Sequence, residues 1–298
     1  MNKKETREFI FRFYRKRVTS FLANLYKASI TGDNEDIHKA RVDVKKIIAL
    51  FRLFEMIVPD SFTKKDHFVL FTKLFETTGK IRETQVNLLL LDLYGIDHPE
   101  IVLFRNFLKN EEKRFTKGFL TTVQKFEEKN LKKTETEIKQ IGEKISQKKF
   151  ICAANTFIQK KAEKIRKLLT NKKTPEYLHK IRQNLKAIGA IATLSATFKK
   201  DKKLDLILLD LSKTEIHIGE WHDKQVLIES MELFFKKKKK SKKSDFPELI
   251  KLTELLIEES NNLQEKILPE VKNLIQNMVG HPTESLPIVP STNLEGNN

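Results

Sequence analysis

Two short segments of the chain carry the same basic residues at the same spacing. Residues 37–45 read IHKARVDVK, and residues 178–186 read LHKIRQNLK. On a helix, positions i, i+3 and i+7 lie within about 60° of one another, so each segment places a histidine, an arginine and a lysine on one face. Arginine offers a fork of N–H groups that matches phosphate oxygens, lysine a mobile charge, and histidine a donor whose charge responds to nearby phosphate. The pattern predicts phosphate binding.

The two basic stripes begin near predicted helix starts. The first stripe is His38, Arg41 and Lys45, which Arg52 extends after a gap at Ile48, and the second is His179, Arg182 and Lys186. Asn34 is expected to cap the first helix, and Thr174 followed by Pro175 the second. Free N–H groups and the helix dipole attract anions at such ends. A single basic stripe is more often a solvated helix face, but its repetition favours a binding site.

A second pair of segments repeats in the same order. Gly79–Val86 reads GKIRETQV, and Gly219–Val226 reads GEWHDKQV. The two glycines are separated along the chain by almost the same interval as His38 and His179. A glycine, an acid, a glutamine and a valine coincide, the acids being Glu83 and Asp223. Two patches in one order at a nearly constant offset indicate an internal duplication.

The elements that carry these motifs are predicted to be helices. The chain has only 9 Gly and 8 Pro, and no stretch alternates with period two for long enough to suggest a strand. The expected helices cover residues 4–29, 35–58, 61–94, 98–129, 150–170, 175–197, 201–235 and 246–278, with shorter ones up to about 149 and with Gly79 and Gly219 as interruptions. The fold class is therefore all-α, with one half at 1–147, another at 148–279 and a disordered tail at 280–298.

Composition limits the possible functions. Of 298 residues, 57 are Lys or Arg and 40 are Asp or Glu, a formal charge of +17 that concentrates anions of any kind. Cys152 is the one cysteine, so neither an internal disulfide nor a cysteine-based metal site is expected. The sequence has no signal-like start and no run of 18 apolar residues, which predicts a cytoplasmic protein without a membrane partner. No phosphate loop, nucleophile elbow or zinc motif occurs, so no enzyme activity, cofactor or metal is predicted.

The repeated motifs resemble those of a known family. The run HKARVDVKKIIALFRLF resembles the signature helix of the CHAD family, the conserved-histidine α-helical domains. LHKIRQNLK resembles its second histidine helix, and GKIRETQV resembles its Gly-x-x-Arg-Asp-x-x-Val segment. The resemblance covers most of residues 5–278. It implies two pseudo-symmetric antiparallel four-helix bundles with a basic channel between them that binds inorganic polyphosphate.

The resemblance also implies which side chains bind phosphate. The matching positions are His38, Arg41, Lys45, Lys46, Arg82, His179, Arg182 and Lys186. Ile48 and Gly189 depart from the pattern, since further basic residues are usual there. Glu83 replaces an aspartate, and His222 stands where the first half has Arg82.

The resulting hypothesis is non-enzymatic binding of inorganic polyphosphate, and it includes association with polyphosphate granules. The predicted phosphate-binding residues are the eight family positions together with Arg52. A nucleic-acid-binding protein is the first alternative, supported by charge alone. A phosphotransfer protein that uses His38 or His179 as phosphoacceptor is the second. The lysine-rich run Lys236–Lys243 is expected to be a solvated loop that steers polyanions at long range.

Overall fold

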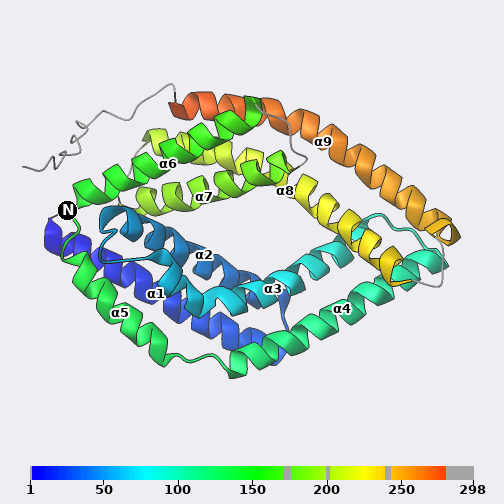
Figure 1. Ribbon diagram of the computed structural model, residues 1–298, viewed down its shortest axis with the longest axis horizontal. Coiled ribbons are helices and arrows are strands. Elements are labelled where there is room, and N and C mark those ends of the chain that lie inside the picture. The colour runs from blue at the N-terminus through cyan, green and yellow to red at the C-terminus, as the bar shows by residue number, and fades with distance from the viewer. Residues whose placement is uncertain (1, 171–175, 199–201, 239–242, 280–298) are drawn as a thin grey trace, which may run out of the picture.

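The described part of the chain is helical, which confirms the predicted all-α class. The computed structural model describes residues 2–170, 176–198, 202–238 and 243–279, and every regular element in these ranges is a helix (Figure 1). The helices are α1 (Lys3–Thr31), α2 (Asn34–Ile57), α3 (Lys64–Leu93), α4 (Pro99–Gln124), α5 (Lys129–Gly142), α6 (Gln147–Thr170), α7 (Tyr177–Phe198), α8 (Lys202–Lys237), the 3-10 turn η1 (Lys243–Asp245) and α9 (Pro247–Val279). The predicted tail at 280–298 lies outside the described residues.

Local signals set the start of α2. Gly32 ends α1 at φ 67°, a left-handed conformation that favours glycine. Asp33, one residue before the predicted cap Asn34, accepts a hydrogen bond from the backbone N–H of Glu35 at 2.7 Å. This cap places His38 at the start of the second turn of α2. The predicted cap at Thr174 and Pro175 of the second half lies outside the described residues.

The predicted interruptions at Gly79 and Gly219 are wrong, because α3 and α8 run through them without a break. A glycine inside a helix costs only about 1 kcal/mol relative to alanine, which the packing of a long helix outweighs. The helix predicted over 98–129 ends earlier, at Gln124, and α5 then begins at Lys129, in the stretch where shorter helices are expected.

Consecutive helices pack as the pairs α1/α2, α3/α4, α6/α7 and α8/α9. Figure 1 shows α2, α3, α7 and α8 between the outer helices α1, α4 and α5 on one side and α6 and α9 on the other. Along this middle layer α2 contacts α7, and α3 contacts α8. The four helices that carry the repeated motifs therefore meet in the centre of the molecule.

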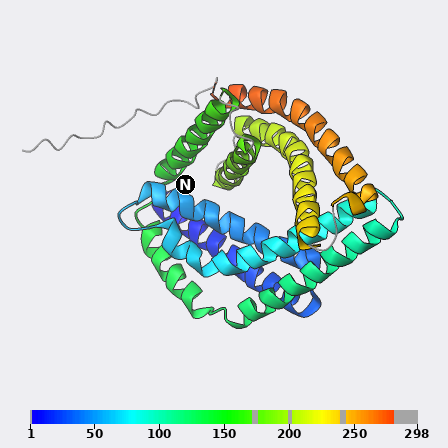
Figure 2. The same ribbon diagram turned by 45° about the vertical axis from the view of Figure 1, so that its right-hand side comes forward.

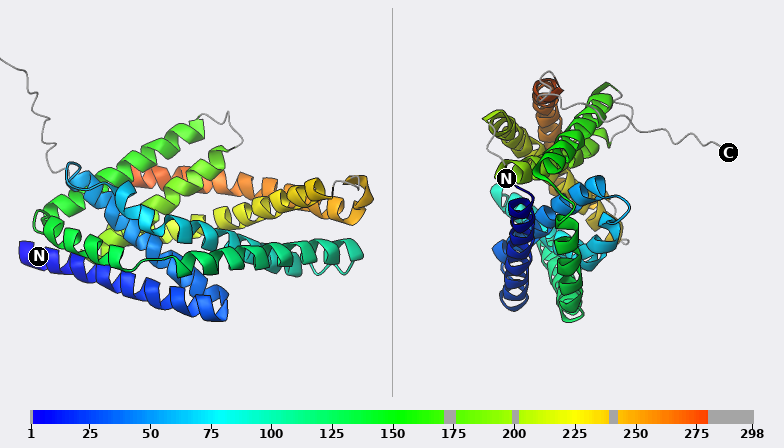
Figure 3. Two further views of the ribbon diagram at one scale, coloured as in Figure 1. Left: turned by 60° about the horizontal axis from the view of Figure 1, so that its bottom comes forward. Right: turned by 90° about the vertical axis from the view of Figure 1, so that its left-hand side faces the viewer.

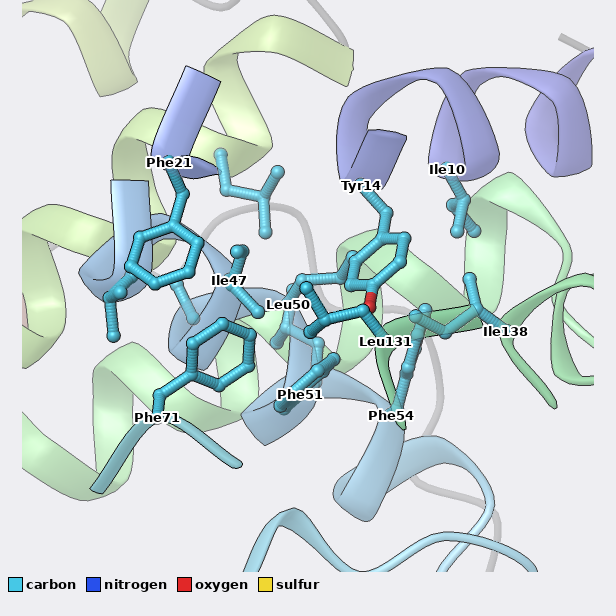
Figure 4. Close-up of a cluster of buried hydrophobic side chains, with 14 of the residues drawn as sticks. Ile10, Tyr14, Phe21, Ile47, Leu50, Phe51, Phe54, Phe71, Leu131 and Ile138 are labelled. Atoms are coloured by element: carbon cyan, nitrogen blue, oxygen red, sulfur yellow. The ribbon is translucent and has the colours of Figure 1, made fainter. Parts of the chain in front are cut away.

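The largest hydrophobic cluster is rich in phenylalanine. Phe21 of α1 packs edge-on against Phe71 of α3 with ring centroids 5.3 Å apart, and Phe51 and Phe54 of α2 belong to the same cluster (Figure 4). The cluster continues into the second half, where Phe150 of α6 and Phe198 of α7 stack at 4.2 Å. It fixes the orientation of α2 and hence of the first basic stripe.

Two smaller clusters complete the core. One surrounds Trp221 and Ile181 between α6, α7, α8 and α9. The other joins the far ends of α3 and α4 to those of α8 and α9, through residues such as Phe104 and Phe234. Figures 2 and 3 show these four helix ends together at one end of the elongated molecule. Hydrophobic contacts thus link the halves on either side of residue 147, and their division at that residue stays a prediction.

Candidate functional site

The two basic stripes converge between α2 and α7. Lys45 remains accessible to solvent, yet protein surrounds it on most sides, and this burial lowers its pKa to about 8. The charges of Lys186, Arg41 and Arg182 lower the pKa further, and Glu215 opposes them. Burial also lowers the pKa of Lys186, with Arg182 as the next cause. Cations from both halves therefore lie within electrostatic range of one another.

Arg41 is held against α3. Its Nη1 donates to the backbone oxygen of Phe75 at 2.5 Å and to Oγ1 of Thr78 at 3.1 Å. The guanidinium carbon lies 4.2 Å from the centroid of the Phe75 ring. A Cβ atom at Gly79 would lie 3.1 Å from Nη1 of Arg41. Gly79 therefore leaves room for the guanidinium, which accounts for the glycine of this motif.

Arg182, the counterpart of Arg41, has no comparable contacts with a glycine and an aromatic ring. A Cβ atom at Gly219 would meet nothing within 4 Å, and Glu215 occupies the position that corresponds to Phe75 in the repeat. The Nε atom of Arg182 is buried without a hydrogen-bond partner among the described residues. Burial lowers its pKa, and Asp223 raises it. A buried donor without an acceptor is costly, and an anion oxygen would satisfy it.

The histidines lie at the edge of this cluster. His38 is exposed, and burial of its ring followed by the charge of Arg82 lowers its pKa. The ring of His179 lies 4.8 Å from that of Trp221 and 5.3 Å from that of His222. Burial, then Arg182, lowers the pKa of His222 to about 3, so this ring is neutral at physiological pH. Its Nδ1 is buried without a partner among the described residues.

Three carboxylates lie among the cations. The pKa values of Glu83, Glu215 and Asp223 are raised, because burial outweighs the opposing effect of nearby cations. The strongest of these cations is Arg41 for Glu83, Lys186 for Glu215 and Arg182 for Asp223. The repeat in the sequence pairs Glu83 with Asp223, but no motif in the sequence predicts that Glu215 lies in this cluster. The basic residues Arg41, Lys45, Arg82, Arg182 and Lys186 outnumber these acids. The cluster therefore keeps a positive charge.

Two predicted residues lie away from the centre. Lys46 faces α1, where burial lowers its pKa and the charge of Arg17 lowers it further. Arg52 lies two turns beyond Lys45, where burial lowers its pKa, the charge of Glu55 raises it, and Lys161 of α6 is within electrostatic range. The structure thus brings the stripes together without Arg52, because the far part of α2 packs against α6.

The lysine-rich run is separate from the cluster. Lys237 ends α8 and forms an ion pair with Glu111 at 3.0 Å, and Lys243 pairs with Glu232 at 2.8 Å. Residues 239–242 lie outside the described residues. Two of its charges are thus already balanced by acids.

Comparison with known proteins identifies the family. The model of the CHAD domain family matches residues 13–232, which is most of the chain. The chain belongs to the CHAD family. A crystal structure of the CHAD domain from the plant Ricinus communis is similar in fold, with a TM-score of 0.69 and 12% sequence identity over 92% of this chain and 91% of that one. The predicted resemblance is confirmed.

No curated protein matches this CHAD chain. Within the described residues, no helix is both long and apolar enough to cross a bilayer. The same residues contain no group of three or more His, Cys, Asp or Glu side chains that could hold a metal ion.

The two motif glycines of the CHAD chain form a matched pair for mutation. Gly219→Ala is expected to raise the free energy of unfolding by about 0.5–1 kcal/mol, because alanine favours the helix and its methyl group meets nothing. Gly79→Ala is expected to bring no gain, or a loss of up to about 1 kcal/mol, because its methyl group displaces the guanidinium of Arg41 from Phe75. Urea denaturation of both variants measures the difference. Equal stabilisation by the two substitutions would contradict the close packing of the Arg41 guanidinium against Gly79.

Proposed function

We propose that this CHAD protein binds inorganic polyphosphate, without catalysing a reaction, in the basic cluster between α2, α3, α7 and α8. The observation that carries the proposal is the convergence of Lys45 and Lys186 from the two halves: both line one cavity, and the charge of Lys186 lowers the pKa of Lys45. Like charges that line one cavity repel one another. A chain of phosphates supplies several negative charges at short spacing and would relieve that repulsion at several points.

The side chains suit different parts of such a ligand. Arg182 has an unsatisfied buried Nε, so its guanidinium is suited to a phosphoryl oxygen. Lys45 and Lys186 supply mobile charges opposite each other. Arg41 is anchored through one Nη atom and contributes the rest of its guanidinium, while His38 and Arg82 extend the basic surface toward the start of α2.

We further propose that the site lies between two pseudo-symmetric halves, 1–147 and 148–279, that arose by duplication. Each is built on four helices, and the first half has α5 as a fifth. The motifs on α2 and α3 recur on α7 and α8 at a nearly constant offset along the chain, and the helix pairs follow in the same order in both halves. Gln85 of α3 donates to Glu112 of α4 at 2.9 Å, and its counterpart Gln225 of α8 donates to Ser260 of α9 at 2.7 Å. In each half, the glutamine of the second motif thus donates a hydrogen bond to the helix that follows.

A titration against two polyanions tests this function. Polyphosphate and single-stranded RNA of matched total charge are each titrated into the protein at near-physiological salt. Polyphosphate is expected to bind at least about tenfold more tightly, because the cluster offers cations that fit phosphate oxygens and, among the described residues, no row of exposed aromatic rings on which successive bases could stack. Equal or tighter binding of RNA would favour a nucleic-acid-binding protein. Phosphohistidine at His38 or His179 after incubation with a phosphodonor would favour phosphotransfer.

The same titration repeated across salt concentrations measures how many contacts are ionic. With about five to eight phosphate contacts and about 0.7 released counterions for each, the slope of log affinity against log salt should be about −3.5 to −5.6. A flat response would contradict binding by charge pairing.

A further inference from the structure

A cavity of about 540 Å³ opens beside the basic cluster, between α1, α2, α7 and α8. Its walls are aliphatic over much of their area, through Val42, Ala190, Leu194, Leu208 and Leu211. Small-molecule sites in proteins have volumes of about 300–1,000 Å³ and mostly apolar walls with a few polar groups. The cavity has the size and lining of such a site.

Four cations contribute to the lining of this cavity. Lys45 and Lys46 of α2 and Lys186 of α7 line it, together with Arg17 of α1, which is held by Asp43 at 3.2 Å. Glu215 is the acid in the lining. The cavity therefore joins an aliphatic interior to the positive charge that the two stripes supply, and this combination is complementary to an anion that carries an apolar group.

The duplication sets this cavity apart from the polyphosphate site. If the two halves were equivalent, a cavity of the same kind would exist beside α2 and α3. In the first half, side chains occupy the corresponding space. Where the cavity is lined by Gly189, Leu208 and Leu211, the first half has Ile48, Phe68 and Phe71, whose side chains pack into the large hydrophobic cluster. Thr193 likewise stands where the first half has Arg52. A symmetrical polyphosphate channel does not require this difference.

We propose that the cavity binds the aliphatic group of an organic phosphate, an ester of phosphate or diphosphate, while its phosphates lie against Lys45, Lys46 and Lys186. The site shares two lysines with the polyphosphate cluster but uses apolar walls that inorganic polyphosphate cannot exploit. Each methylene buried in such walls strengthens binding about fourfold. Gly189 contributes by letting α7 approach α8 closely, since a Cβ atom there would lie 3.0 Å from Cδ2 of Leu211.

The test compares geranyl diphosphate with inorganic diphosphate, which has the same anionic group and no apolar part. Geranyl diphosphate is expected to bind to the full chain at least about tenfold more tightly, measured by calorimetry. Ser212→Phe fills the cavity from an exposed position on α8 without changing any charge, and should abolish this advantage. Thr193→Leu, also exposed, is a second filling variant in case the first does not fold. Thr121→Phe, at an exposed position on α4, is the matched control and should keep the advantage.

Three outcomes would overturn the proposal. These are equal affinity for the two diphosphates, an advantage that persists in the folded Ser212→Phe variant, and tighter binding of ATP than of geranyl diphosphate, which would assign the cavity to a heteroaromatic group. Polyphosphate is titrated into the same variants, and its affinity should change less than about twofold. Failure of the wild-type chain to bind polyphosphate would refute the proposed function and leave the cavity result standing on its own.

Discussion

Replacing Lys45 and Lys186 together with glutamine is expected to weaken polyphosphate binding about a hundredfold at near-physiological salt. Each lysine lines the cavity at the centre of the cluster, and burial lowers its pKa. A charge-assisted hydrogen bond lost from such a site costs about 1.5–3 kcal/mol, which is at least tenfold in affinity. Calorimetric or fluorescence titration of the folded double variant measures the loss.

Lys237→Gln together with Lys243→Gln is the matched control, since it removes the same number of positive charges. Both lysines are exposed and already paired, with Glu111 and Glu232. They act on a polyanion mainly at long range and are screened by salt, so a loss of only a few-fold is expected. If the two double variants lost affinity equally, bulk charge would account for binding and the paired-stripe site would be rejected.

The lysines are a better choice than the arginines for this test. Arg41 donates to the backbone of α3 and packs on Phe75, so an alanine there would also disturb the contact between α2 and α3. Lys45 makes no such contact in the described structure.

The sequence was sufficient to predict the all-α fold and most of the residues that the structure brings together in the basic cluster. Helical periodicity placed His38, Arg41 and Lys45 on one face, and the repeat indicated that a second stripe belongs with the first. Both inferences need only local geometry and register. Arg52 shows their limit: the same periodicity places it on the face of Lys45, but cannot tell that the far part of α2 packs against α6 rather than α7.

The remaining features depend on contacts between helices. The motif glycines look alike in sequence, yet Gly79 supports a guanidinium and Gly219 faces open space. The difference follows from the residues four positions earlier, Phe75 in one half and Glu215 in the other, which become meaningful only once α2 lies against α3 and α7 against α8. The cavity beside Lys186 is equally invisible to periodicity, because it arises from small residues on separate helices.

Polyphosphate affinity is expected to fall about tenfold between pH 7.5 and pH 9.5. In the free protein the pKa of Lys45 is about 8, so its ammonium group loses its proton over this range. The internal phosphates of the ligand stay ionised throughout, and they favour the charged lysine, so binding takes up a proton. Lys45→Met should remove most of the pH dependence and leave the part due to Lys186, whose pKa is also lowered. A wild-type affinity that is constant over this range would contradict the central position of Lys45.

The same lysine should oppose folding in the absence of ligand. Its pKa is about 8 in the folded protein against an ordinary value of 10.5, so the folded state binds the proton more weakly than the unfolded state does. Below pH 8 Lys45 is charged in both states, and the free-energy cost of surrounding its charge with protein reduces stability in full. As the pH rises from 8 to 10.5, the folded protein loses this proton before the unfolded chain does, so the folded state becomes relatively more stable. Lys45→Met is therefore expected to raise the free energy of unfolding at pH 7 by about 1–2 kcal/mol, a value reduced for the solvent that reaches this side chain. The gain over wild type should vanish above pH 10.5. Urea denaturation at pH 7 and pH 10.5 measures both values, and a variant less stable than wild type at pH 7 would mean that Lys45 contributes to folding rather than being held ready for an anion.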